Sequence, residues 1–164
     1  MLNRLKTATV AAIAIVVMAP VSAQTPPAAG LAASSPAKQA IDARRAAYLL
    51  IGNNFRSIGD VLQGRAAYDA VEMRMRAGRV AFLATFVGEN FPDASNAGLP
   101  LTRAKASIWG DRAEFDRLLV EFQKHAETLK EVAATQDSAS PAFKAAAGAV
   151  GQDCKGCHDK FREK

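Results

Sequence analysis

The stretch IDARRAAYLLIGNNFRSIGDVLQG, residues 41–64, carries an apolar stripe with a heptad period. Apolar residues at this spacing fall on one face of an α-helix. The stretch therefore predicts a long amphipathic helix, from about Ala37 to Gln63, that ends at Gly64 because glycine is a common residue just after a helix. The side chains of the stripe are Ile41, Tyr48, Ile51, Phe55, Ile58 and Leu62.

Three further helices are predicted downstream. The second covers about residues 66–87, and the third begins at Asp111, with Glu114 at the spacing of a capping box. The fourth opens at Ser140, a good N-cap residue, with Pro141 in its first turn. The side chains expected to form the buried faces of the second and third helices are Val71, Met75, Phe82, Phe86, Phe115, Leu118, Phe122, Leu129 and Val132.

Four amphipathic helices, joined mostly by short turns, are typical of an all-α, antiparallel up-down-up-down four-helix bundle. The connection over residues 88–110 is long for a loop. We therefore expect it to pack against the bundle, with Phe91 and Trp109 as its anchors.

Residues 1–23 have the pattern of an export signal. Arg4 and Lys6 precede an apolar run over residues 9–18, and the small residues VSA come just before Gln24. The run is short for a transmembrane helix, which needs about 20 apolar residues, but an uncleaved membrane anchor stays open as an alternative. We predict a signal peptide at 1–23, a flexible linker at 24–36, a bundle domain at 37–164, a periplasmic location and no membrane span after cleavage.

The charge of the chain argues against a nucleic-acid partner. Residues 1–23 hold two of the 21 basic residues and none of the 16 acidic ones, so the remaining chain has a net charge of +3. Basic runs interleaved with aromatic residues, which are typical of nucleic-acid interfaces, are lacking.

The segment DCKGCHDKF, residues 153–161, contains both cysteines of the chain and one of its two histidines. Cys154, Cys157 and His158 stand at i, i+3 and i+4, so they project from one face of a helix. C-x-x-C-H is the attachment signature of c-type haem. It predicts haem c bound covalently through Cys154 and Cys157, with His158 as an axial ligand of the iron.

The competing interpretations of the two cysteines are weaker. A disulfide between residues three apart would close a very small loop and stabilise little. A structural zinc site needs four Cys or His ligands, and only one further histidine is present. A thioredoxin-type redox pair normally follows a strand, and no βαβ pattern is present.

Beyond these motifs, the chain resembles the cytochromes c′, the class II family of c-type cytochromes. The resemblance lies in RRAAYLLIGNNFRSIGDVLQG (44–64), YDA (68–70), TRAKASIW (102–109) and CKGCHDKFR (154–162). In this family an arginine of the first helix is followed four residues on by the residue at the distal face of the haem. The resemblance therefore implies that Arg44 lies near the haem propionates and that Tyr48 faces the iron.

The resemblance also implies the coordination of the iron. A neutral tyrosine is a poor ligand, because phenolate forms only near pH 10, so we expect five-coordinate, high-spin iron held by His158 alone. Arg162, one turn after His158, is a candidate for the proximal face, and Arg45 is a weaker candidate than Arg44 for the propionates. Met75 and His125 remain open as alternative sixth ligands of the iron, and Met73 is a weaker candidate than Met75. Gly52, one turn after Tyr48, is a candidate site of close approach by the haem or a neighbouring helix.

The function implied by the resemblance is binding of nitric oxide and carbon monoxide together with electron transfer to a periplasmic redox partner. A six-coordinate, low-spin electron carrier is the alternative. An enzyme is not expected, because no distal His–Arg pair is present on one helix to assist O–O cleavage. Members of the family are commonly homodimers joined through the first two helices, for which the candidate contact residues are Leu49, Val61 and Phe82.

Overall fold

A computed structural model describes residues 34–96 and 102–164. The predicted signal peptide and most of the predicted linker lie outside the described residues. The described part contains no strand, and its helices are α1 (Pro36–Leu62), α2 (Ala70–Val87), α3 (Ser107–Gly110), α4 (Arg112–Thr135) and α5 (Pro141–Phe161).

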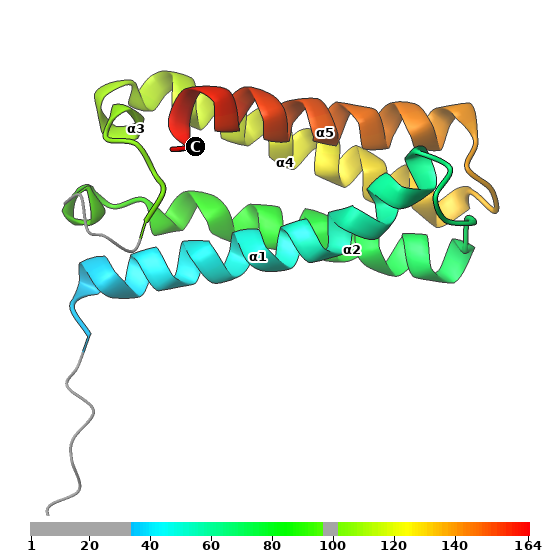
Figure 1. Cartoon of the computed structure of the whole chain (residues 1–164), viewed down its shortest axis with the longest axis horizontal. Coiled ribbons are helices and arrows are strands. Elements are labelled where there is room, and N and C mark those ends of the chain that lie inside the picture. The colour runs from blue at the N-terminus through cyan, green and yellow to red at the C-terminus, as the bar shows by residue number, and fades with distance from the viewer. Residues whose placement is uncertain (1–33, 97–101) are drawn as a thin grey trace, which may run out of the picture. The chain divides into compact units, whose positions relative to one another are not determined.

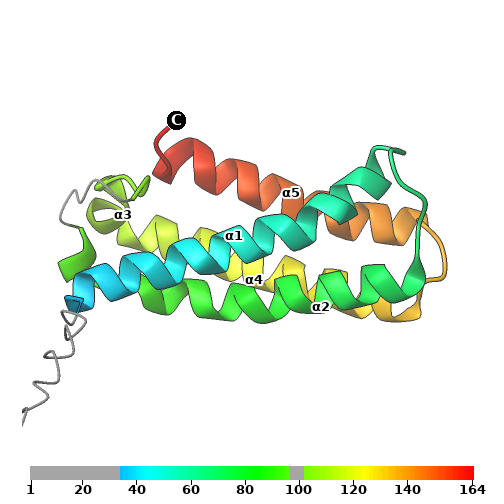
Figure 2. The same cartoon turned by 60° about the horizontal axis from the view of Figure 1, so that its bottom comes forward.

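The four long helices form the predicted antiparallel bundle (Figures 1 and 2). Helix α1 packs along α2, α2 packs along α4, and α4 packs along α5. Between α1 and α5 the contact is sparse. None of the helices in the described segments is long and apolar enough to span a bilayer.

The ends of α1 follow from its sequence. The Ser35 hydroxyl caps the helix by accepting a hydrogen bond from the Lys38 amide at 3.2 Å, and Pro36 occupies the first turn. Gly64 has a φ of +68°, a left-handed conformation that glycine adopts without strain. The predicted stop at Gly64 and the predicted apolar stripe are both confirmed.

Helix α2 differs from its prediction in two ways. It begins at Ala70 rather than near residue 66, because the Asp69 carboxylate caps it by accepting from the Glu72 amide at 2.7 Å. The predicted buried face was also wrong: Val71, Met75, Phe82 and Phe86 are 74%, 42%, 63% and 44% exposed. The face that packs against α1 and α4 consists instead of Met73, Ala77, Val80, Ala81, Ala84 and Val87.

The capping box predicted at the start of α4 does not form. Asp111 is the N-cap residue, but its side chain makes no capping hydrogen bond. The Glu114 carboxylate accepts from Arg117 at 2.7 Å and pairs with Lys160, which draws it away from the helix end. The predicted buried face of α4 is confirmed: Phe115, Phe122 and Leu129 are buried, with Leu118 and Val132 half-buried.

Helix α5 begins as predicted, with the Ser140 hydroxyl accepting from the Phe143 amide at 3.2 Å and Pro141 in the first turn. At this end of the bundle the four helices close on one another. We call it the closed end, and its buried residues are Ile58, Val61, Met73, Ala77, Leu129, Ala133, Phe143, Ala147 and Val150. Val61, a candidate for a dimer contact, is therefore part of the core.

The connection between α2 and α4 packs on the bundle, as predicted. Phe91 is buried, with its ring centroid 4.7 Å from that of Phe115 and 6.1 Å from that of Trp109. The Trp109 indole N–H donates to the Pro92 carbonyl at 3.2 Å. Gly88, at the start of the connection, lies so close to α4 that a Cβ there would come within 2.9 Å of Leu119 Cδ2.

Candidate functional site

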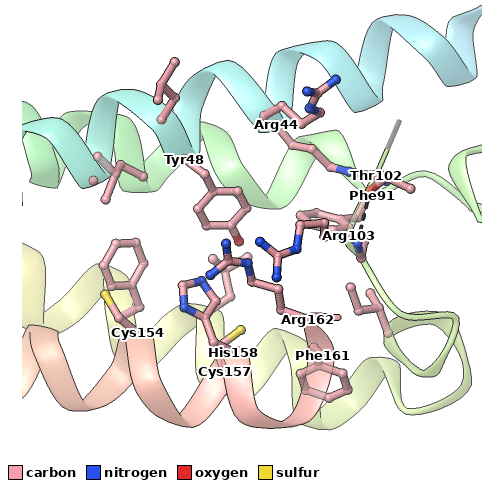
Figure 3. Close-up of a pocket in the computed structure, with 18 of the residues that line it drawn as sticks. Arg44, Tyr48, Phe91, Thr102, Arg103, Cys154, Cys157, His158, Phe161 and Arg162 are labelled. Atoms are coloured by element: carbon pink, nitrogen blue, oxygen red, sulfur yellow. Dashed lines mark hydrogen bonds between the residues drawn. The ribbon is translucent and has the colours of Figure 1, made fainter. Parts of the chain in front are cut away.

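A pocket of about 910 Å³ lies between α1 and α5, at the end of the bundle opposite the closed end (Figure 3). We call this the pocket end. The volume is near the top of the roughly 300–1,000 Å³ that small-molecule and cofactor sites occupy. Its apolar wall is formed by Ile51, Phe91, Ile108, Phe115, Leu118, Leu119, Phe122 and Phe161.

Helix α5 brings Cys154, Cys157 and His158 to one side of the pocket (Figure 3). The two thiols are free and partly buried against the core. Burial raises the pKa of Cys154 to about 11, with smaller contributions from Asp153 and Cys157, and burial also raises the pKa of Cys157. In the folded chain the two thiols are therefore protonated at neutral pH.

The His158 imidazole is neutral at neutral pH. Burial lowers its pKa, and the positive charges of Arg162 and Arg103 lower it further against the opposing effect of Asp159. Figure 3 shows the Arg103 and Arg162 side chains pointing into the space beside the His158 ring. A neutral imidazole keeps a nitrogen lone pair, which is the form that binds a metal.

The C-terminal end of α5 is fixed to the connection between α2 and α4. Residues Ala104 and Arg162 form an isolated antiparallel bridge. The Lys105 amide donates to the Phe161 carbonyl at 3.0 Å, and the Glu163 amide donates to the Arg103 carbonyl at 2.8 Å. The bridge holds the last turn of α5, including His158, beside residues 103–105 of the connection.

Tyr48 projects from α1 into the pocket, toward α5 and His158 (Figure 3). Burial raises the pKa of its phenol above the usual value, and Cys157 and Cys154 raise it further. The phenol is therefore protonated throughout the ordinary pH range. Within the described part of the chain, no hydrogen bond involves its hydroxyl group.

Arg44 is only 2% exposed, and its guanidinium is held by residues of the connection. It donates to the Asn90 carbonyl at 3.2 Å, to Ser95 Oγ at 2.8 Å and to Thr102 Oγ1 at 2.9 Å. It also lies over the Phe91 ring, 4.7 Å from the centroid. Burial lowers its pKa, but an arginine stays charged.

No carboxylate lies within 4.0 Å of Arg44, although all sixteen acidic residues fall in the described segments. A buried charge without a counter-ion is costly, and Arg44 lines the pocket. The pocket therefore offers two thiols, a neutral imidazole, an apolar wall and a buried cation. These residues fit haem, a flat apolar group with iron at its centre and propionate carboxylates at its edge.

None of the three alternative ligands lies among the residues that line the pocket. Met73 is buried in the core of the bundle. Met75 is on the exposed face of α2. His125 is on α4, and its Nδ1 lies 2.7 Å from the Asp153 carboxylate. Gly52 lines the pocket, but a Cβ added there would meet no atom within 4 Å, so the fold itself does not require a glycine for close approach.

Residues 39–162 match the sequence model of the family described as Cytochrome C'. This chain belongs to the cytochrome c′ family. The cytochrome c′ of Rubrivivax gelatinosus is 35% identical over 125 residues, which cover 76% of this chain and 95% of the relative.

Solved cytochromes c′ also share the fold. The cytochrome c′ of Shewanella frigidimarina aligns with a TM-score of 0.74 at 37% identity, over 80% of this chain and 98% of that chain. The nitric oxide complex of a mutant cytochrome c′ from Alcaligenes xylosoxidans aligns with a TM-score of 0.69 at 29% identity, over 78% and 97%. Cytochromes c′ bind haem c, so the cofactor of this chain is haem c, attached through Cys154 and Cys157.

Several residues of the site were not predicted. Asn90, Ser95 and Thr102 hold Arg44, and Arg103 lies beside His158. The motif TRAKASIW contains Thr102 and Arg103, but nothing in its local pattern indicates that it meets both α1 and the end of α5.

Proposed function

We propose that this chain is a periplasmic haem protein in which His158 is the only protein ligand of the iron, and which binds nitric oxide or carbon monoxide and takes part in electron transfer. The observation that carries the proposal is Tyr48. It is the residue on α1 that points toward His158, and its protonated phenol is a poor ligand. Met75 and His125 lie elsewhere.

The bound haem supplies an iron that changes oxidation state and coordinates a diatomic gas. The residues that line the pocket determine which molecules can reach the iron. Tyr48 and Ile51 of α1 and Phe122 of α4 line the pocket with mostly apolar surface, and such a surface admits small uncharged molecules more readily than ions. The Tyr48 hydroxyl donates a hydrogen bond to a gas held on the α1 side. The Alcaligenes xylosoxidans relative was solved with nitric oxide bound, which supports gas binding here.

Optical and EPR spectra of the haem-loaded protein, ferric and ferrous, test this function. We expect high-spin spectra that shift when carbon monoxide or nitric oxide is added. A low-spin spectrum in both oxidation states, unmoved by carbon monoxide, would contradict the proposal and would mean that a second protein ligand is present. The mass of the same sample shows whether residues 1–23 have been removed, as export to the periplasm requires.

The hydrogen-bonding role of Tyr48 is tested by Tyr48→Phe. Because a neutral hydrogen bond contributes about 0.5–1.5 kcal/mol, we expect nitric oxide and carbon monoxide to dissociate roughly two- to tenfold faster. The ferric spectrum should stay high-spin, since the phenol is not a ligand. If the ferric spectrum changes while gas dissociation does not, the phenol acts on the iron rather than on the gas.

Arg44 is proposed to hold a haem propionate as well as the connection. Its buried guanidinium has no carboxylate partner in the folded chain, and a propionate supplies one. Arg44→Leu should reduce haem loading and lower the free energy of unfolding by about 1–3 kcal/mol, the cost of leaving buried polar groups unpaired. Arg74→Leu on α2 is the matched control, because Arg74 is exposed and lies outside the pocket.

A homodimer is proposed through the exposed apolar face of α1 and α2. Phe82 and Phe86 pack edge-to-face at 5.0 Å on that face. Phe82→Lys should convert a dimer to a monomer in sedimentation velocity, whereas Val120→Lys, an equally exposed apolar site on α4, should not. The residues of the face are Leu50, Val71, Met75, Phe82 and Phe86. Leu49 instead lines the pocket.

A further inference from the structure

Four exposed arginines surround the pocket. We call them the rim arginines: Arg45, Arg56, Arg103 and Arg162. None of them has a carboxylate within 4.0 Å, although every acidic residue of the chain lies in the described segments. Other arginines of the protein do form ion pairs, with Asp60, Glu72, Asp116, Glu114 and Glu121.

The two acidic residues that line the pocket do not offset this charge. Asp42 pairs with Lys38 at 2.5 Å, and Asp153 contacts His125 at 2.7 Å. Haem brings only two propionates, so at least two of the rim arginines keep no anionic partner after the cofactor is attached. The mouth of the loaded pocket is therefore positively charged.

One edge of the pocket opening is formed by an exposed face of α1. Arg45, Leu49, Gly52 and Arg56 follow one another at helical spacing along it and line the pocket. Leu49 is 65% exposed between the two arginines, and Gly52 leaves the surface beside it flat. An apolar centre flanked by charged groups is the usual arrangement of a protein–protein contact, and complementary charge orients the partner.

We propose that the rim arginines and Leu49 form the docking site for an acidic one-electron carrier protein. Carboxylates of the carrier face the rim arginines, and an apolar side chain of the carrier covers Leu49. One electron passes from the reduced carrier to the ferric haem, so the carrier is oxidised by one electron and no bond is made or broken. The site rests on the proposed haem function, because it places the carrier over the pocket that holds the cofactor.

An anionic membrane surface fits the rim less well. Of the two exposed leucines between the rim arginines of α1, only Leu49 lines the pocket, whereas Leu50 does not. The arginines surround a pocket opening rather than forming a broad apolar and basic face. A protein whose acidic side chains project into the opening can reach them all. Binding of the rim arginines to an anionic membrane is therefore an alternative that the experiment below must exclude.

The test measures reduction of the haem-loaded ferric protein by reduced plant-type [2Fe–2S] ferredoxin, an acidic one-electron carrier, in an anaerobic stopped-flow instrument. The variant R45E/R56E reverses two rim charges. Its matched control is R74E/K124E, because Arg74 and Lys124 are exposed, form no ion pair with any of the acidic residues and lie outside the pocket.

At low ionic strength we expect R45E/R56E to lower the second-order rate constant at least tenfold, since charge steering changes association rates by about 10–10³. The control should change it less than about twofold, and added salt should slow the wild type and reduce the difference. Equal loss in both variants, or no loss in R45E/R56E, would overturn the docking site.

Two further readouts separate the possible failures. Haem content and the ferrous carbon monoxide spectrum are measured in the wild type and in both variants, and each rate constant is expressed per loaded haem, because Arg45 and Arg56 line the pocket that holds the cofactor. A loss of haem in R45E/R56E is thereby separated from a loss of docking. If the wild type itself binds no haem, the haem function fails and not the docking site alone. Vesicles of phosphatidylglycerol are the second probe. Co-sedimentation that R45E/R56E abolishes, without any effect on ferredoxin, would overturn the proposal in favour of a membrane surface.

Discussion

The two ends of the bundle use the same helix pattern for different purposes. At the closed end, Ile58 of α1 is fully buried against the neighbouring helices. At the pocket end, Tyr48 belongs to the same heptad stripe, but it lines a cavity of about 910 Å³. An amphipathic stripe in the sequence therefore indicates which face of a helix is apolar, but it does not indicate what covers that face. At the closed end other helices cover the apolar face, and at the pocket end we propose that the haem does.

The largest expected effect concerns the pocket end. Replacing both thiols, Cys154→Ser with Cys157→Ser, should abolish covalently attached haem completely, because no other cysteine is present in the chain. Haem staining of a denaturing gel measures this. Each single variant is the control and should keep one thioether bond. Haem that remains on the gel in the double variant would show that the attachment is elsewhere.

At the closed end, Leu129→Ala should affect stability and not the cofactor. Leu129 is fully buried, and truncating a buried leucine costs about 2–5 kcal/mol in the free energy of unfolding. Denaturant unfolding of the haem-loaded protein measures the loss, while the haem spectrum should be unchanged.

Leu119→Ala is the counterpart of Leu129→Ala at the pocket end. Leu119 is half-buried and lines the pocket. Leu119→Ala should therefore lower the free energy of unfolding less than Leu129→Ala does, and it should change the rate of carbon monoxide binding. If the two variants alter the gas kinetics equally, the two ends are not separate in function.

The third prediction concerns pH. The pKa of Cys154 is about 11 in the folded chain because of burial, whereas an exposed thiol titrates near 8.5. Above that pH the unfolded chain loses a proton that the folded chain keeps, so the free energy of unfolding of the haem-free chain should fall between about pH 8.5 and 11. Below pH 8.5 the Cys154 thiol is protonated in both the folded and the unfolded chain, so it does not make the free energy of unfolding depend on pH.

Haem-loaded protein is the control for the pH series. Its sulfur atoms are thioethers and do not ionise, so the fall between pH 8.5 and 11 should be weaker. An equal slope in the two forms would assign the effect to another group, of which Tyr48 is the first candidate, since burial raises its pKa too.

The smallest effect is expected from Gly52→Ala. A Cβ at this position meets no atom within 4 Å, and alanine is favoured over glycine inside a helix by about 1 kcal/mol. The haem-free chain should therefore gain up to about that amount of stability. A loss of haem loading in the same variant would show that the cofactor, rather than the fold, requires the glycine.

Much of the architecture was predictable because it depends on local chemistry. Gly64, Ser140 and the heptad stripe of α1 act within one or two turns of their own positions. The C-x-x-C-H motif is also local, so the α5 side of the site could be placed from the sequence.

The face of α2 was not predictable from its large side chains. Ala77, Ala81 and Ala84 recur at helical spacing and allow close contact with α1 and α4, whereas Phe82 and Phe86 are left outside. Side-chain size favoured the wrong face, and the alanine spacing was the signal that could have corrected it. The partners of Arg44 lie 46–58 residues away along the chain, so no local pattern could have revealed them.

The contact between Gly88 and Leu119 has a consequence for the engineering of this protein. Gly88 is outside the pocket, but Leu119 forms part of the pocket wall, and a methyl group at residue 88 would come within 2.9 Å of its Cδ2. A larger residue at position 88 must displace the Leu119 side chain, and because that side chain lines the pocket, we expect the shape of the cavity to change. Under the proposed gas-binding function, position 88 would therefore adjust which gases enter the pocket from a residue outside it, independently of the chemistry at the iron.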